Sequence, residues 1–402
     1  MGGDNRRVER SDELTPEWVD RRWQQLAVSA DARAALDDPQ TRALMQRYAR
    51  NIENFIGTAK VPVGLAGPLR VNGRHAHGEY FVPLATTEAA LVASYSRGAQ
   101  LITHAGGCRA MVTDEGIARA PGFAFADLAE AAAFAQWVDA QRDRLREVAA
   151  TTTRYGALQD IQTLVEGNHA YLRCTFSTGE AAGQNMATIA TAAICRHILA
   201  HAPVAPRYHF VEANFSGDKK ATVMSLLGVR GRRATAEIEL ARALVRDKLH
   251  ADVERIAEYW RMGAIGTAMS GSIGIHGHYA NGLAALFIAC GQDAACVAEA
   301  AIGISRLEAT PAGDLYAAVT LPNLVVGTVG GGTGLPTQSA CLEILGLRGP
   351  SSADAFAEVC AGLCLAGELS ITSALCADEF TAAHERLARR GKAQDQRAAR
   401  DG

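Results

Sequence analysis

The stretch Asn214-Phe-Ser-Gly-Asp-Lys-Lys220 places two ammonium groups beside a carboxylate, on a loop of small residues after the strand-like run Tyr208–Ala213. Such a cluster can bind an anionic substrate, or stabilise a negative oxygen that forms during a reaction. Taken alone, an Asp-Lys-Lys run is more typical of a solvated charged turn. Other motifs along the chain have to decide between these two interpretations.

Two carboxylates stand out when the search is extended outward from this loop. Glu88 ends the run Ala85-Thr-Thr-Glu88 at a predicted helix start, where the helix dipole favours a negative charge and lowers the pKa of the carboxyl group. Asp293 follows Gly291-Gln292 and closes a long uncharged run, so we expect it to be buried and to have a partner. Either residue could also be a simple helix cap. A general acid needs a raised pKa, which a second carboxylate held close to Glu88 would provide.

Composition sets the broad class. The chain has 402 residues, 48% of them hydrophobic and 21% charged, which suits two or three globular domains. A net charge of -3 gives no basic field for nucleic acid or an anionic membrane. The uncharged stretches 263–292 and 315–341 are interrupted by Gly, Ser, Thr, Asn or Pro, which indicates buried core and not a membrane span.

The cysteines indicate a reducing compartment. There are nine of them, scattered without a CxxC pair, and Cys360 and Cys364 are four residues apart in an apolar helical run. No apolar segment of the kind found in secretory signals follows Met1. We therefore expect free core thiols and a cytoplasmic protein.

The pattern of apolar residues predicts a helical unit that is interrupted by a smaller mixed unit. For the larger unit we predict a charged helical segment over residues 1–50 with Trp18 and Trp23 as docking residues, a loop over Ile52–Leu69, a helix from Thr86 or Thr87 to about His104, a long amphipathic helix over Thr235–Trp260, buried helices over Asn281–Ala289 and Ser339–Leu345, and helices over Ser351–Leu375 and Glu379–Arg390.

The smaller unit has a β-α-β-β-α-β order, which is the split βαβ arrangement. Its predicted elements are a strand or hairpin over Arg109–Ala120, a helix over Phe125–Ala149, strands over Ile161–Val165 and Tyr171–Phe176 around a Gly167-Asn168 turn, a helix over Glu180–Ala200, and a strand over Tyr208–Ala213. The chain has no GxGxxG run, so any nicotinamide cofactor must be bound without the standard Rossmann fingerprint.

The Asp218-Lys-Lys220 loop, Glu88, Asp293 and the run Gly330-Gly-Gly-Thr333 together resemble 3-hydroxy-3-methylglutaryl-coenzyme A (HMG-CoA) reductases of the biosynthetic, NADPH-dependent kind. The resemblance covers about residues 52–390. It implies an α/β (α+β) fold with a helical large HMG-CoA-binding domain over 51–120 and 211–402. A ferredoxin-like small NAD(P)-binding domain is inserted over 121–210. It further implies a homodimer or homotetramer, with the site where one subunit's large domain meets its neighbour's small domain.

The implied reaction is the four-electron reduction of HMG-CoA to mevalonate and coenzyme A, through hemithioacetal and aldehyde intermediates, with two NADPH oxidised. In this resemblance Lys219 stabilises the negative oxygen, Glu88 is the acid, and Asp293 links the two by hydrogen bonds. His384 protonates the departing thiolate, a task that suits an imidazole.

The resemblance also implies two sets of binding residues. Those for the substrate are Arg119, Lys220, Asn281, Glu53 and Arg97. Those for NADPH are Thr153, Arg154, Glu180, Gly183, Asn185, Met186, Gly330, Gly331, Gly332 and Thr333. Arg154 is matched to the 2′-phosphate of the cofactor. No metal is implied.

Two departures from the animal-type pattern bear on substrate affinity: Glu212 stands where that pattern has a Ser, and Met262 stands near a position where it has a Lys. Two other functions stay open at this point: NAD-dependent oxidation of mevalonate, and a non-catalytic coenzyme A-binding homologue. The Asp-Lys-Lys loop and Arg154 argue against the first, and retention of the four reactive residues argues against the second.

Overall fold

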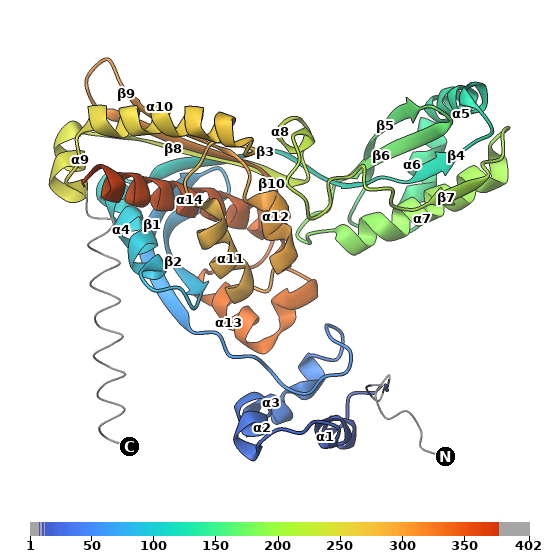
Figure 1. Cartoon of the computed structure of the whole chain (residues 1–402), viewed down its shortest axis with the longest axis horizontal. Coiled ribbons are helices and arrows are strands. Elements are labelled where there is room, and N and C mark those ends of the chain that lie inside the picture. Colours follow the sequence, from blue (N-terminus) through green and yellow to red (C-terminus); the bar gives the residue numbers. More distant parts are fainter. Residues whose placement is uncertain (1–7, 9, 12, 378–402) are drawn as a thin grey trace.

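The computed structural model describes residues 8, 10, 11 and 13–377. The chain forms three parts: a small helical unit near the N-terminus, a large unit around a sheet, and a smaller mixed unit at the far end (Figure 1). The predicted helix over Glu379–Arg390 and His384 lie outside the described residues.

The large unit is built on a sheet with the strand order β2-β1-β3-β8-β10-β9. All neighbours are antiparallel except β1 and β3, which are parallel. The strands are β1 (Val63–Gly73), β2 (His77–Ala85), β3 (Cys108–Arg119), β8 (Gly231–Leu240), β9 (Ile304–Ala309) and β10 (Leu315–Leu324). The helices and helical turns are α4 (Leu91–His104), α8 (Met224–Leu227), α9 (Arg242–Leu249), α10 (Val253–Ser270), α11 (Tyr279–Ala289), η2 (Ala294–Cys296), α12 (Val297–Ala300), η3 (Gly331–Gly334), α13 (Pro336–Ile344) and α14 (Ser352–Cys376).

Helix α14 is the core of the large unit and packs against α4, α11 and several strands. By length and composition alone it could cross a membrane, but 89% of its most apolar window is buried inside the molecule. Its fully buried carboxylate Glu358 accepts hydrogen bonds from the backbone N–H groups of Arg74, His75, Ala76 and Val112. A buried charge is tolerated when it is satisfied in this way.

The smaller unit has four antiparallel strands in the order β5-β6-β4-β7. Its strands are β4 (Gly122–Ala124), β5 (Leu158–Glu166), β6 (His169–Phe176) and β7 (Tyr208–Phe210), and its helices are α5 (Leu128–Ala140), α6 (Arg142–Ala150) and α7 (Gln184–His201). The last three residues of β3 pair with β6, so one strand runs from the large sheet into the small one. The predicted strand pair around Gly167-Asn168 is confirmed, whereas the predicted helix Phe125–Ala149 is two helices that meet at Gln141.

The helix predicted over Thr235–Trp260 is wrong. Residues 231–240 form β8, a central strand, and α9 and α10 follow it. The reason is the period of the pattern: Ala234, Ala236, Ile238 and Leu240 are buried while the residues between them are less so. Strict alternation is the mark of a strand, and it outweighed the looser helical spacing used in the prediction.

Three predicted boundaries also differ. The loop Ile52–Leu69 ends early because β1 begins at Val63. Helix α4 begins at Leu91, since Ala90 has a left-handed φ of 69° that interrupts the helix, and the Thr86 hydroxyl instead accepts from the N–H of Glu88. Helix α7 begins at Gln184 and not at Glu180.

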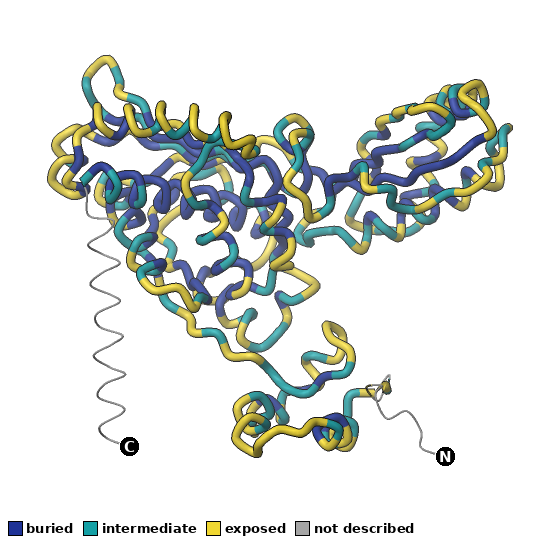
Figure 2. The backbone as a smooth tube through the Cα atoms, in the orientation of Figure 1, coloured by how far each residue is buried: buried dark blue, intermediate teal, exposed yellow. Residues whose placement is uncertain are grey.

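The uncharged stretch 263–292 is only partly core. Helix α11 within it is buried, but the second half of α10 is not: Ile265 and Met269 are 63% and 84% exposed, and Met262 just before the stretch is 74% exposed. Figure 2 shows this outward side of α10 in yellow above the dark blue α14. The expectation of buried core is therefore wrong for α10. It is confirmed for β10, in which eight of the ten residues are buried.

The N-terminal unit consists of α1 (Pro16–Gln24), α2 (Ala30–Leu36), α3 (Pro39–Ala43) and the turn η1 (Met45–Arg47). Val19, Trp23, Met45 and Phe55 form its own small core. Trp23 is confirmed as a docking residue because it is buried and its indole N–H donates to the carbonyl of Ile56 at 2.9 Å.

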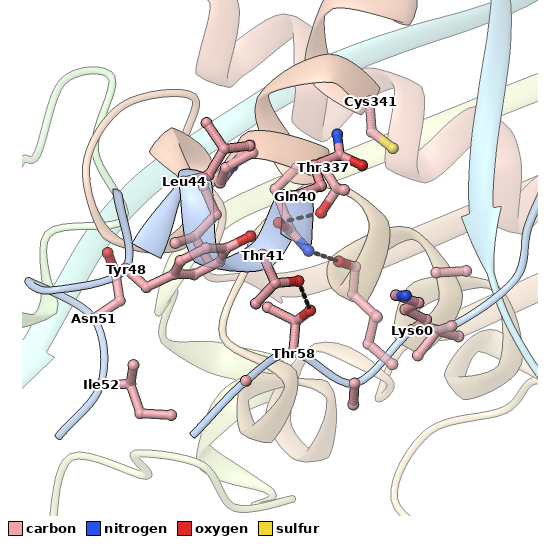
Figure 3. A pocket seen from close by; sticks show the side chains of 18 of the residues that line it. Gln40, Thr41, Leu44, Tyr48, Asn51, Ile52, Thr58, Lys60, Thr337 and Cys341 are labelled. Carbon is pink, nitrogen blue, oxygen red and sulfur yellow. Dashed lines mark hydrogen bonds between the residues drawn. The ribbon is translucent and has the colours of Figure 1, made fainter. Parts of the chain in front are cut away.

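A cavity of about 590 Å³ lies between this unit and helices α11 and α13 (Figure 3). The hydroxyl groups of Thr41 and Thr58, both in its wall, are hydrogen-bonded at 2.8 Å. None of the predicted site residues within the described part of the chain lines it.

Candidate active site

The loop that contains the Asp-Lys-Lys run is held in an unusual backbone conformation. Asn214, Gly217 and Lys219 have left-handed φ values of 63°, 78° and 55°. Left-handed backbone is unfavourable for a residue with a side chain such as Lys219, and it persists only where the surroundings hold it.

Lys219 and Asp293 form an ion pair, which is one of the two Asp293 contacts that the family resemblance implied. The Lys219 Nζ lies 2.8 Å from the Asp293 Oδ2, and the two side chains are 41% and 43% exposed. The hydrogen bond that Lys219 donates to Asp293 raises the pKa of the Lys219 amine, which further favours its protonated form. Asp293 also caps η2 by accepting from the N–H of Ala295. The two interpretations of Asp293 are thus compatible, although it is less buried than expected.

Arg119 is paired inside the protein. It is 8% exposed, and its Nη1 lies 3.0 Å from the Asp218 Oδ2 and 3.3 Å from the Glu212 Oε2. Glu212 also accepts from the backbone N–H of Ala120 and Asn214. In contrast, Lys220 is exposed, and among the described residues its Nζ donates to the carbonyl of Asp218. Of the two predicted carboxylate-binding cations, Lys220 is the accessible one.

The predicted cofactor run lies at the N-terminal end of α7. Gly183 is the N-cap with a φ of 79°, and a Cβ there would lie 2.2 Å from the Thr178 side chain. A Cβ on Gly156, two residues after Arg154, would lie 2.6 Å from the Met186 methyl group. These close approaches place the Thr153–Arg154 turn beside the first turn of α7. Both the exposed N–H groups and the dipole of such a helix end favour an anion.

The glycine-rich loop joins this helix end to Asp293. The side-chain amide of Gln292 pairs with both the N–H and the carbonyl of Gly327 at 2.9 Å. A Cβ on Gly291 would lie 2.3 Å from the carbonyl oxygen of Gly332, so these two loops touch through their backbones. Gln184, at the start of α7, donates to the sulfur of Cys296 at 3.0 Å.

The predicted cofactor-binding residues differ in whether their side chains already have partners within the protein. Arg154 is exposed and has no hydrogen bond or ion pair within the described part of the chain, and Asn185 is also exposed. The Glu180 carboxylate, however, accepts from the N–H groups of Ser351 and Ala353 and from the Ser352 hydroxyl, and so caps α14. The Thr153 hydroxyl closes a turn, and that of Thr333 donates to the carbonyl of Gly330. A Cβ on Gly330 or Gly331 would meet only open space.

Glu88 lies away from this assembly. Its carboxylate is exposed and, among the described residues, makes no hydrogen bond or ion pair with Lys219 or Asp293. Its charge is one of the smaller causes, after burial, that raise the pKa of Tyr95, whose hydroxyl contacts Gly282 at the start of α11. Asp293 follows the other end of α11, which has 11 residues. A helix of that length spans about 16 Å.

The remaining predicted substrate residues also lie apart from Lys219. Asn281 is near the start of α11, on the same side as Glu88. The Arg97 guanidinium donates to the hydroxyl and the carbonyl of Ser370, and so ties α4 to α14. Glu53 is exposed beside a small surface hollow near the N-terminal unit.

A lysine–carboxylate pair beside glycine-rich loops and a helix N-terminus is typical of an oxidoreductase site, here on a mixed helix and antiparallel-sheet fold. A family model described as hydroxymethylglutaryl-coenzyme A reductase matches residues 19–389. The 3-hydroxy-3-methylglutaryl-coenzyme A reductase of Pyrococcus horikoshii is 43% identical over 348 residues, which is 85% of this chain and 84% of that protein. That of Haloferax volcanii is 43% identical over 371 residues, 90% and 91% of the two chains. The chain belongs to the HMG-CoA reductase family.

Solved structures show the same fold at lower identity. The class II 3-hydroxy-3-methylglutaryl-CoA reductase from Streptococcus pneumoniae, bound to NADPH in open conformations, is 21% identical with a TM-score of 0.65. The match covers 90% of this chain and 97% of that one.

Three residues near Lys219 were missed by the sequence interpretation: Gln292, Arg230 and Glu299. Arg230 and Glu299 are 2% and 0% exposed and lie beneath the loop. A signal existed for Glu299, since it is a lone acid in the small apolar run from Val297 to Ile302. A charge in such a setting is rarely placed there without a partner.

Proposed function

We propose that this chain reduces HMG-CoA to mevalonate and coenzyme A with two NADPH, and that Lys219 and Asp293 are the centre of its catalytic site. The main support for this proposal is the ion pair between these two residues, in which the charged atoms are 2.8 Å apart. A protonated lysine held by a carboxylate can stabilise the negative oxygen that forms as a carbonyl carbon accepts hydride.

The residues at the start of α7 fit a dinucleotide. The helix begins at a glycine with open backbone N–H groups, the Arg154 guanidinium has no protein partner among the described residues, and Gly330 and Gly331 border open space. Arg154 would hold the 2′-phosphate and the start of α7 would hold the pyrophosphate. NADPH supplies both hydrides when it is bound. We infer a smaller role for Glu180, because its carboxylate is already used to cap α14.

Each side chain has a separate task in the proposal. Asp293 keeps Lys219 charged and pointed at the reacting carbonyl, and the exposed Lys220 binds the free carboxylate of the substrate. Arg119 shapes the loop through Asp218 and Glu212. Glu88 donates a proton in the hydride steps and His384 protonates the leaving thiolate.

We further propose that the smaller unit, residues 121–210, is an inserted ferredoxin-like dinucleotide domain, and that a homodimer or larger oligomer completes the site. The β5-β6-β4-β7 order with its connecting helices supports the first part. The separation of Glu88 from Lys219, and the exposed apolar stripe of Met262, Ile265 and Met269, support the second. The nine cysteines are all buried and are not joined in disulfides, which suits a cytoplasmic protein.

The direct test is NADPH oxidation, followed by absorbance, with HMG-CoA as the second substrate. Two NADPH consumed for each coenzyme A released, with mevalonate as product, is the expected result. Oxidation of mevalonate with NAD, without any reduction of HMG-CoA, would instead establish the oxidative function. If folded protein catalyses neither reaction, only a binding role would be left.

A further inference from the structure

A buried ionic cluster lies directly under the left-handed turn at Lys219. The Arg230 Nε lies 2.7 Å from the Glu299 Oε2, and the Arg230 guanidinium is also paired with Asp218. The Arg230 backbone N–H donates to Asn323 and its Nη1 donates to the carbonyl of Ala118, so the arginine is fixed from several sides.

Glu299 connects this cluster to Lys219 itself. Its Oε1 accepts from the backbone N–H of Lys219 at 3.1 Å. Glu299 comes from α12, six residues after Asp293, which holds the other end of the same lysine. The backbone and the side chain of Lys219 are therefore both attached to the segment from Asp293 to Glu299.

Burial of a carboxylate at this position costs free energy unless hydrogen-bonding or charged partners compensate for the lost water. Burial raises the pKa of Glu299 to about 7 even though the charge of Arg230 opposes the shift. A neutral side chain would be easier to bury here, because a fully buried charge needs specific partners. The partner here is the strained residue that carries the reacting amine.

We propose that Glu299, supported by Arg230, is a positioning residue that holds the left-handed backbone of Lys219 and thereby aims its amine. The inference rests on the proposed catalytic role of Lys219. Neither residue touches the substrate in this proposal; both act through the lysine. A misplacement of the reacting group by about 1 Å can cost about 100-fold in rate, so the expected effect of losing Glu299 is of that order.

The test is the variant Glu299→Gln, assayed at pH 8, where the wild-type carboxylate is ionised. The amide has nearly the same shape, but it must present a donor either to the N–H of Lys219 or to Arg230, so one contact is lost. We expect kcat to fall with both HMG-CoA and mevaldehyde while KM for NADPH is unchanged, because the cofactor residues are on other loops. Arg230→Lys keeps the charge but loses the fork that bridges Asp218 and Glu299, and it should behave in the same way.

Two controls separate positioning from general stability. Glu358→Gln makes the same change in an equally buried carboxylate whose described partners are backbone N–H groups, and it should lower the melting temperature without a comparable loss of kcat. In a Lys219→Ala background, Glu299→Gln should cause no further loss of the residual rate. A purely structural role would lower the rate equally in both backgrounds.

The outcomes also separate this proposal from the function on which it rests. If Lys219→Ala turns over normally, the proposed catalytic role fails. If Lys219→Ala is inactive but folded Glu299→Gln and Arg230→Lys keep the wild-type kcat, only the positioning role is overturned. A fall in rate by the same factor in both Lys219 backgrounds overturns it as well.

Discussion

The Lys219 Nζ lies 2.8 Å from the Asp293 Oδ2 of the same chain, whereas Glu88 is exposed near the other end of α11. The Lys219 half of the proposed site is therefore assembled within one chain, on strained and internally bonded backbone. In the Glu88 half, Glu88 is exposed and Asn281 is half-buried. Our proposal that a second copy of the chain completes the site accounts for this difference, since the Glu88 half of one copy would then lie against the Lys219 half of the other.

The largest expected effect concerns the half that is already assembled. Lys219→Ala should lower kcat by about 10²–10³ with both HMG-CoA and mevaldehyde, because one electrostatic group serves both hydride steps. Steady-state kinetics on each substrate, with circular dichroism to confirm folding, measures this. Near-normal turnover of either substrate would show that the ion pair with Asp293 is only structural.

The cofactor surface beside that half gives the next prediction. Arg154→Ala removes a charge-assisted contact worth roughly 1.5–3 kcal/mol, which should raise KM for NADPH about 10- to 150-fold. KM for NADH should stay nearly the same, since NADH has only a hydroxyl group at the 2′ position. An equal rise for both cofactors would remove the 2′-phosphate role from Arg154.

The exposed stripe on α10 tests whether two copies meet. Ile265→Glu places a charge on a surface that is 63% exposed in one chain. If a second copy covers it, the unpaired buried charge should weaken association by at least about tenfold. Sedimentation over a range of concentrations measures this. The control is Leu128→Glu, a charge added at a 60% exposed site in the small unit; equal dissociation constants for the two variants would argue against contact through α10.

The smallest effect is a pH dependence that belongs to the Lys219 half. The folded pKa of Glu299 is about 7, above its ordinary value of 4.5, so the folded state binds this proton more tightly than the unfolded state does. Its contribution to stability is complete below pH 4.5 and is lost as the pH rises through 7. Between pH 5 and pH 8, the free energy of unfolding of the wild type should therefore fall by about 1–2 kcal/mol relative to that of Glu299→Gln, which has no titrating carboxyl group at this position. Denaturant titrations of the two proteins at each pH measure this difference. A difference that is constant with pH would mean that Glu299 has no raised pKa.

The sequence was sufficient for the parts of the fold whose local pattern agrees with their final environment. Helix α14 is mostly apolar and is buried along most of its length, and the Gly167-Asn168 turn forms the predicted hairpin. The Lys219–Asp293 pair was also predicted, but through family resemblance, because 73 residues of chain separate the two.

The failures have a common physical cause, which is that tertiary contacts decide what local pattern leaves open. Residues 231–240 have both helical and alternating apolar spacing, and the neighbouring strands β3 and β10 fix them as β8. The second half of α10 is uncharged but exposed. An apolar composition indicates that a surface tends to be covered, but it does not show whether the same chain or another molecule covers it. The ion pairs of Arg119 with Glu212 and Asp218 were likewise not predicted, because these partners lie 93 and 99 residues further along the chain; its substrate role stays a prediction.

The most direct test of a site shared between two copies is complementation between Lys219→Ala and Glu88→Gln. Each homo-oligomer should be inactive, because every site lacks one of the two groups. When the variants are co-expressed, half of the dimers are mixed and each mixed dimer has one intact site of its two, so activity should recover to about a quarter of the wild-type value. Mixed dimers that are isolated through two different tags, yet remain as inactive as the parents, would contradict a site formed by two copies.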